Sequence, residues 1–248
     1  MNAPSRLLNV PAGDPGDRLA DLRARLAGRI VFTTSFGIED QALTHHIFSR
    51  GLEIEVVTLD TGRMFPSTYT VWDETEQKYG RRIRAFYPDA GSVSEMVADA
   101  GINGFYHSKD ARLACCHVRK VEPLHRALAG AEAWVTGLRA DQSGDRSSVP
   151  LEAFDEERQL VKFAPLFDWT RPDIVDFCAA ERVPVNSLHA EGFLSIGCQP
   201  CTRAIAPGEP ERAGRWWWET EGAAECGLHV GPDGRLFRGL SFDTETAA

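Results

Sequence analysis

Long apolar runs, sequence repeats and an excess of positive charge are all missing from this 248-residue chain. No stretch approaches the roughly 18 consecutive apolar residues of a membrane-spanning helix, and residues 1–17 lack the apolar centre of a signal peptide. Lys and Arg number 27 against 36 Asp and Glu, and this net charge of −9 argues against sequence-independent binding to nucleic acid. We therefore expect no membrane span and no nucleic-acid partner, and an anionic ligand would need a local basic pocket.

Cysteine is also scarce, because six residues in a chain of this length are too few for a disulfide scaffold. Four of them form two groups, the adjacent pair Cys115 and Cys116 and the later pair Cys198 and Cys201. Grouped thiolates predict a metal centre in a reducing cytoplasm. An iron–sulfur cluster fits better than a tetrahedral zinc ion, since adjacent cysteines point their side chains apart on most backbones. Four buried cysteines without a metal are the remaining alternative.

Strand-like and helix-like segments alternate along most of the chain. The expected strands are residues 29–34, 54–59, 83–87, 133–137 and 160–163. The expected helices are residues 19–26, 38–50, 66–79, 92–100, 122–129 and 171–181. This alternation predicts a single α/β domain with a mostly parallel sheet and helices on both faces. From about residue 184 the pattern fades into loops.

The first two strand-to-helix turns are the candidate ligand site, because ligands of open α/β sheets bind beyond the carboxyl ends of the strands. The first turn reads TTSFGIED over residues 33–40, before a helix whose free N–H groups favour an anion, and the second reads LDTGR over 59–63. One such turn is usually only a helix cap, but two together favour a phosphate. The residues expected at the ligand are Ser35, Gly37, Asp40, Asp60, Thr61, Gly62 and Arg63.

These turns resemble the nucleotide-binding loops of the adenine nucleotide α-hydrolase-like superfamily, a Rossmann-like group that includes ATP pyrophosphatases and adenylylsulfate reductases. A pyrophosphatase would carry the loop SGGxDS. Residues 35–41 read SFGIEDQ instead, which is similar to the reductase loop. An ATP-dependent adenylating enzyme is therefore disfavoured.

Motifs further along the chain narrow the resemblance to the assimilatory adenylylsulfate reductases. Two of them contain the grouped cysteines, ACCHVRKVEPL at residues 114–124 and SIGCQPCTR at 195–203. The others are TGLRADQS at 136–143, NSLH at 186–189, RAGRWWWE at 212–219 and ECGLH at 225–229. The resemblance covers the chain from about residue 29 to residue 229, and several ordered motifs identify a family more securely than any single one.

The resemblance implies a [4Fe-4S] cluster held by Cys115, Cys116, Cys198 and Cys201. It implies that Cys226 attacks adenosine 5′-phosphosulfate (APS), and His229 would share its face if that segment is helical. Thioredoxin would be the reductant, in cytoplasmic sulfate assimilation and cysteine biosynthesis. The cations expected at the substrate are Lys120, Arg212 and Arg215 from the motifs, and Arg139, which follows a predicted strand end.

The expected organisation has four parts: an N-terminal extension and helix (1–28), a nucleotide-binding and iron–sulfur domain (29–205), a catalytic segment (206–230) and a flexible tail (231–248). Cys178 is expected in the core, and the histidine pair at residues 45 and 46 is not expected to bind metal. Relatives often associate, so a homo-oligomer is expected as well. Two other functions stay open: a reductase of the 3′-phosphorylated substrate (PAPS), and a non-enzymatic iron–sulfur redox sensor.

Overall fold

The structure is a computed structural model that describes residues 13–219. The strands are β1 (Arg29–Thr34), β2 (Glu55–Leu59), β3 (Arg84–Phe86), β4 (Ala131–Val135), β5 (Glu152–Asp155) and β6 (Leu160–Phe163). The helices are α1 (Pro15–Arg25), α2 (Ile38–Ser49), α3 (Pro66–Tyr79), α4 (Ala90–Ala100), α5 (Lys109–Cys116), α6 (Glu122–Leu128) and α7 (Arg171–Ala180). The predicted tail over 231–248, and with it the end of the predicted catalytic segment, lies outside the described residues.

Six strands form one sheet in the order β3-β2-β1-β4-β6-β5, and every neighbouring pair is parallel except β5 and β6. Val31 of β1 is opposite Glu55 of β2, and Phe32 of β1 is opposite Val135 of β4. The chain moves outward from β1 in one direction to β3, and then returns to the other side of β1 with β4. The connections therefore separate between β1 and β4, which is where open α/β sheets form a ligand crevice.

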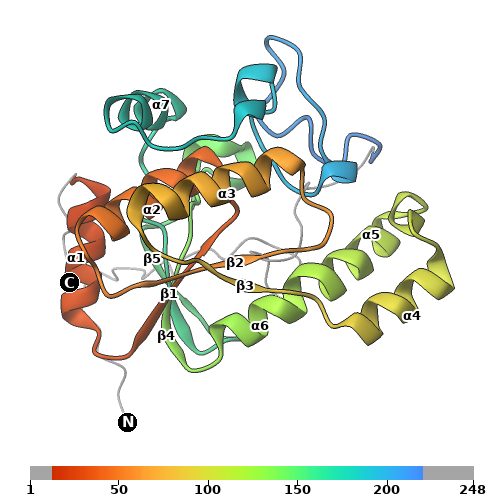
Figure 1. The fold of residues 1–248 in the computed structure, drawn as a ribbon, viewed down its shortest axis with the longest axis horizontal. Helices are drawn as coiled ribbons and strands as arrows, with labels where there is room; N and C mark the ends of the chain where they lie inside the picture. Colours follow the sequence, from red (N-terminus) through yellow and green to blue (C-terminus); the bar gives the residue numbers. More distant parts are fainter. Residues whose placement is uncertain (1–12, 220–248) are drawn as a thin grey trace, which may run out of the picture.

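Helices cover both faces of the sheet, as the sequence predicted (Figure 1). Side chains alternate along each strand, so Ile30 and Phe32 of β1 pack with α1, α2, α3 and α7, while Val31 packs with α6. The first cluster includes Leu19 and Leu43, and both are fully buried. Continuous apolar strands are the pattern of a parallel sheet buried on both faces.

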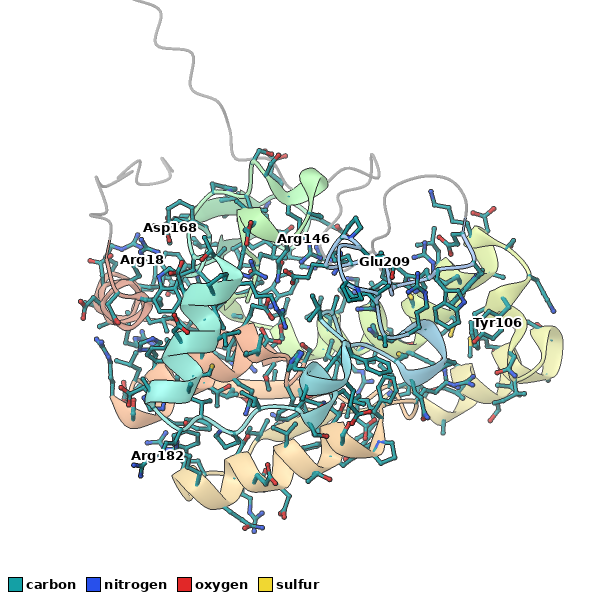
Figure 2. All side chains as sticks on the ribbon, turned by 90° about the horizontal axis from the view of Figure 1, so that it is seen from above. Arg18, Tyr106, Arg146, Asp168, Arg182 and Glu209 are labelled. Atoms are coloured by element: carbon teal, nitrogen blue, oxygen red, sulfur yellow. The ribbon has the colours of Figure 1, made fainter. Side chains whose placement is uncertain are left out.

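Helix ends follow the predicted signals. Pro66 occupies the first turn of α3, and Gly80 ends that helix in the left-handed conformation with φ of 62°. Thr170 caps α7, and the Asp173 carboxylate accepts hydrogen bonds from the backbone N–H and the hydroxyl of Thr170. The arginine of α1 nearest the sheet, Arg18, donates to both carboxylate oxygens of Asp168 at 2.6 and 2.7 Å. Figure 2 shows this pair at one end of the molecule and Tyr106 near the other.

Among the α-helices and strands, α5 and β5 were not predicted. Helix α5 continues through a π-helical turn, η2 (His117–Val121), into α6. Pro123 has no N–H, and its ring would clash with the Arg119 carbonyl in a regular helix, which explains the wider turn. Strand β5 is the antiparallel edge strand and has an exposed side chain at Phe154. Within residues 13–219, no helix is both long enough and apolar enough to cross a membrane.

Candidate active site

A polar pocket opens at the carboxyl ends of β1, β2 and β4, where the sheet connections separate. Its walls come from the turns after these strands, from the π-helical turn η2 and from the loop region after residue 189. The predicted ligand residues that line it are Ser35, Gly37, Asp40, Thr61, Lys120, Arg212 and Arg215. The structure thus brings together seven residues that the sequence spreads over 181 positions, from 35 to 215.

The turn after β1 is held by Asp40. Oδ2 of this carboxylate accepts hydrogen bonds from the backbone N–H and from the hydroxyl of Ser35, both at 2.6 Å. Burial raises the pKa of Asp40 to about 6, although the bonds from Ser35 act in the opposite direction. Phe36 takes the left-handed conformation with φ of 59°, and its fully buried ring stacks on Trp72. The ring packing offsets the cost of that conformation.

The turn after β4 must approach the first turn closely. A Cβ atom at Gly137 would collide with the carboxylate of Asp40, so only glycine fits there. The first peptides of α2 follow Gly37, which makes no side-chain cap with any described residue. Gly37, Glu39 and Asp40 line the pocket, so the start of α2 lies at the pocket, and a helix start favours an anion.

The four predicted residues of the turn after β2 have different roles in the structure. Thr61 lines the pocket, and its hydroxyl lies 3.3 Å from Sγ of Cys198. Asp60 lies outside the pocket lining, where it accepts a 2.8 Å bond from Gly62 N–H and bonds from the Tyr69 hydroxyl. Burial and this carboxylate raise the pKa of Tyr69 to about 12, so the phenol remains a donor. Asp60 and Gly62, whose φ is 69°, thus shape the turn.

Arg63 points away from the polar pocket. Its guanidinium donates to the carbonyl of Ile102 at 2.5 Å and to Oδ1 of Asn103 at 2.9 Å, and it lies over the ring of Phe105. It lines a second, smaller cavity instead, which also contains the grouped cysteines. The structure therefore places Arg63 beside the cysteines and away from the strand ends where the sequence led us to expect it.

Four cations line the polar pocket: Lys120, Arg146, Arg212 and Arg215. Arg215 is only 8% exposed, lies over the Trp216 ring and donates to the Ile196 carbonyl at 3.4 Å. A Cβ atom at Gly197 would collide with its guanidinium. These groups form the local basic pocket that an acidic protein needs to bind an anion.

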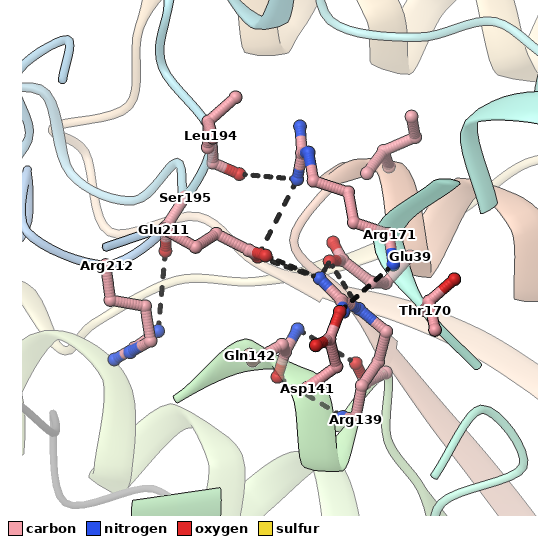
Figure 3. A network of polar contacts seen from close by, with 12 residues as sticks. Glu39, Arg139, Asp141, Gln142, Thr170, Arg171, Leu194, Ser195, Glu211 and Arg212 are labelled. Atoms are coloured by element: carbon pink, nitrogen blue, oxygen red, sulfur yellow. Dashed lines mark hydrogen bonds and ion pairs between the residues drawn. The ribbon is translucent and has the colours of Figure 1, made fainter. Parts of the chain in front are cut away.

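Arg139 lies behind the pocket wall and not among its lining residues. Its side chain is fully buried, and every guanidinium nitrogen donates to a carboxylate, of Glu39, Asp141 or Glu211 (Figure 3). Burial alone would raise the pKa of Glu39, but the charges of Arg139 and Arg171 together with hydrogen bonds to the carboxylate lower it overall. Burial and the charge of Glu39 raise the pKa of Glu211.

The four grouped cysteines line one small cavity next to the polar pocket. Cys115 and Cys116 end α5, while Cys198 precedes and Cys201 ends a short 3₁₀ turn, η6 (Gln199–Cys201). Cys198 and Lys120 line both cavities, so the two sites share a wall. Among residues 13–219, no three His, Cys, Asp or Glu side chains are grouped to hold a single metal ion. Ligation by these cysteines stays a prediction.

The thiols of this cavity differ in pKa. Burial would raise the pKa of Cys198, but the charge of Lys120 and the hydrogen bond from Thr61 lower it overall. Burial raises the pKa of Cys115, and it raises that of Cys201 to about 11. Of these three thiols, Cys198, at the shared wall, is the one whose surroundings favour the thiolate.

Two other sequence predictions concern described residues outside these cavities. Cys178 is buried in the main core, where burial raises its pKa to about 12. The histidine at position 46 stacks on Phe177, and His45 contacts the hydroxyl of Tyr79 at 2.9 Å. Cys226 and His229 lie outside the described residues, and their roles stay predictions.

The sequence reasoning missed several pocket residues as individual contacts. They are Thr33, Thr34, Glu39, Trp134, Thr136, Gln142, Arg146, His189, Ser195 and Glu211. Thr34, Glu39 and Thr136 could have been found, because they directly follow or flank strand ends. Arg146 carried no such signal, since it reaches the pocket only through the short helical turns after Arg139.

Comparison with known proteins agrees with this arrangement. Residues 29–204 match the phosphoadenosine phosphosulfate reductase domain family. The chain is 56% identical over 207 residues to the adenosine 5′-phosphosulfate reductase of Agrobacterium fabrum, covering 84% of this chain and 80% of that protein. It is 53% identical over 232 residues to the enzyme of the same name from Sinorhizobium fredii, covering 93% and 92%.

A solved structure shares the fold at much lower identity. Phosphoadenylyl-sulfate (PAPS) reductase from Candida auris, crystallised as a phosphate complex, superimposes with a TM-score of 0.66 at 23% identity. The match covers 78% of this chain and 91% of that one. At this identity the likeness supports the architecture alone.

Proposed function

Because the chain belongs to the phosphoadenosine phosphosulfate reductase domain family, we propose that it reduces APS to sulfite and AMP in sulfate assimilation. Its curated relatives at 53–56% identity carry the name adenosine 5′-phosphosulfate reductase. The observation that carries the proposal is the shared wall. A pocket with four cations adjoins a cavity with four thiols, and Lys120 and Cys198 belong to both.

The polar pocket suits the nucleotide end of APS. The start of α2 and the hydroxyl-bearing turns at the pocket suit the 5′-phosphate. Arg212 and Arg215 offer guanidinium groups to the sulfate oxygens and to the departing phosphate. A thiolate that attacks a sulfate sulfur meets like charge, so fixed cations at this position supply the main electrostatic stabilisation.

The second cavity fits the proposed [4Fe-4S] cluster in its donor set. Four thiols line it, and Arg63, Arg112 and Arg119 line it too, which would offset the negative charge of bound thiolates. When bound, the cluster would supply structural and electrostatic support next to the substrate.

Cys226 is the proposed nucleophile. Its thiolate attacks the sulfate sulfur, the bond from sulfur to the bridging oxygen of AMP breaks, and AMP leaves, so that S-sulfocysteine remains on Cys226. Cys226 is the seventh residue after Glu219, where the described chain ends. That length of chain spans at most about 25 Å, so the placement of Glu219 limits where the thiolate can act.

Thioredoxin is the proposed reductant. One of its thiols attacks Sγ of Cys226, sulfite leaves, and its second thiol breaks the mixed disulfide and restores Cys226. The two electrons thus come from the dithiol. Cytoplasmic location, self-association and assistance by His229 stay predictions.

The test is sulfite release by anaerobically purified protein with thioredoxin, with APS and PAPS offered in parallel. We expect activity with APS and little with PAPS. Preference for PAPS would agree with the proposed mechanism and contradict the proposed substrate. The structurally similar Candida auris protein is named a PAPS reductase, which is why PAPS is included in the test.

The redox-sensor alternative predicts no sulfite with either substrate while iron is fully bound. Cys226→Ser separates the two functions further, because the enzyme should lose sulfite release and retain its iron. Turnover by Cys226→Ser protein would contradict the mechanism.

A further inference from the structure

We propose that Arg139 is a positioning residue, which holds the arginine-bearing wall of the pocket in place through Glu211 without touching the substrate. The inference rests on the proposed function. It differs from the sequence-based expectation that Arg139 binds the ligand directly, and it assigns a task to the carboxylates that line a pocket meant for an anion.

The contacts of Arg139 leave its guanidinium enclosed. Nη2 donates to both carboxylate oxygens of Glu211, at 2.9 and 2.8 Å. Nε and Nη2 donate to Oε1 of Glu39 at 3.1 and 3.0 Å, and Nη1 donates to Asp141 at 3.0 Å. The side chain has no exposed surface. A substrate in the pocket would therefore meet Glu39 and Glu211 before it met Arg139.

The network joins segments from different parts of the fold, as Figure 3 shows. Glu39 belongs to the first turn of α2, and Glu211 directly precedes Arg212 in the loop that ends at Arg215. Arg171, at the start of α7, lies 3.6 Å from Glu211 and donates to the Leu194 carbonyl at 3.2 Å. Arg139 therefore connects the loop that contains Arg212 and Arg215 to the carboxyl ends of the strands.

Charge is the second part of the argument. Glu39 and Glu211 both line the pocket, where they would repel a phosphosulfate unless they were neutralised. Arg139 donates hydrogen bonds to both carboxylates and so places its positive charge between them. Without it, two buried carboxylates would face each other across the same space, and their repulsion would push the loop outward.

Arg139→Met and Arg139→Lys test the proposal, with binding of APS measured in a Cys226→Ser background so that no turnover occurs. We expect Arg139→Met to weaken APS binding at least about tenfold, because misplaced binding groups cost this much or more. Arg139→Lys should weaken it less, since it keeps the charge and loses the fork. In the Cys226-containing enzyme, KM should rise more than kcat falls, and iron content should not change.

Glu211→Gln gives a test of opposite sign. If Glu211 only lined the pocket, removing its negative charge would tighten binding of an anion. If Glu211 instead holds the loop in place through its bonds with Arg139, the same change should weaken APS binding by roughly threefold or more. The double variant Arg139→Met/Glu211→Gln should bind no more weakly than Arg139→Met, because the pair acts as one unit.

Arg18→Met is the matched control. Arg18 is also buried and also forms a two-pronged contact with a carboxylate, that of Asp168, but neither residue lines the pocket. The Arg18→Met variant should have a lower free energy of unfolding and an unchanged affinity for APS. The inference is overturned if Arg139→Met binds APS like the parent, if Arg18→Met weakens binding equally, or if Glu211→Gln tightens it. A parent protein that does not bind APS would instead overturn the proposed function, and this inference with it.

Discussion

The polar pocket and the cysteine cavity share a wall but are built in different ways. The part of the pocket at the strand ends is formed by turns that directly follow strands, and short-range bonds such as those from Ser35 to Asp40 hold its first turn. The cysteine cavity lies beyond the sheet, and contacts between distant segments close it, including Tyr106 to the Pro200 carbonyl and Arg112 to Glu219. The sheet thus organises the pocket, whereas the cavity depends on packing between α5 and the later loop.

The largest effect should come from Cys198, because it belongs to both sites. We expect Cys198→Ser to lose bound iron and to lower sulfite release at least about a hundredfold, since removing a ligand destabilises the whole metal site. AMP binding should change by less than about threefold, because the strand-end turns remain folded. Iron analysis, sulfite release and calorimetric titration with AMP measure the three quantities.

Cys178→Ala is the control for this experiment, since Cys178 is a core thiol away from both cavities. It should keep its iron and its activity. If Cys198→Ser abolished AMP binding as well, the two sites would not be separable in the way their construction indicates.

A smaller loss should follow from removing a cation on the pocket side of the wall. Arg215→Met should lower kcat/KM for APS by about 10² to 10³, as expected for one donor aimed at developing charge, while iron content stays constant. Arg203→Met is the matched control, because Arg203 is in the same loop but pairs with Glu209 away from the pocket. Equal losses in the two variants would show that the loop, and not the Arg215 charge, sets activity.

The first turn of the pocket should make stability depend on pH. The pKa of Asp40 is raised by burial from 3.8 to about 6, so between these values the folded protein holds a proton that the unfolded chain has lost. Stability therefore falls as pH rises through this window. Asp40→Asn removes the effect, so its free energy of unfolding relative to the parent should increase by roughly 2–3 kcal/mol from about pH 4 to about pH 7. Urea unfolding at both pH values measures this, and a constant difference would contradict it.

The smallest effect should come from one closing contact of the cysteine cavity. Tyr106→Phe removes the 2.6 Å bond to the Pro200 carbonyl, at a side chain that is 39% exposed. Iron should then be lost to a chelator about two to five times faster, since an exposed hydrogen bond contributes about 0.5–1 kcal/mol. Tyr87→Phe, at a more exposed position, should lose iron at the parent rate. Unchanged iron loss in Tyr106→Phe would mean that this contact does not hold the cavity closed.

Much of the sheet could be predicted because the residue types of each strand reflect how deeply that strand is buried. Residues 30–34 are continuously apolar or β-branched, and β1 has the predicted bounds 29–34. Helix α3 begins at Pro66 and ends before Gly80 as expected. Helix α5 was missed because its apolar stripe is short and its Ser108 cap is a weak local signal. Strand β5 was missed because an exposed, four-residue edge strand has little pattern of its own.

The sequence by itself determined the α/β alternation, the two ligand turns, the grouped cysteines and the family, because these are properties of neighbouring residues and their order. Only the tertiary structure decided which arginines face the pocket. Arg212, Arg215 and Arg139 carry the same charge and occur in similar motifs, but burial and partners separate them: two line the pocket, while Arg139 is enclosed by carboxylates from distant segments. Such a partition depends on long-range packing, and no local pattern contains it.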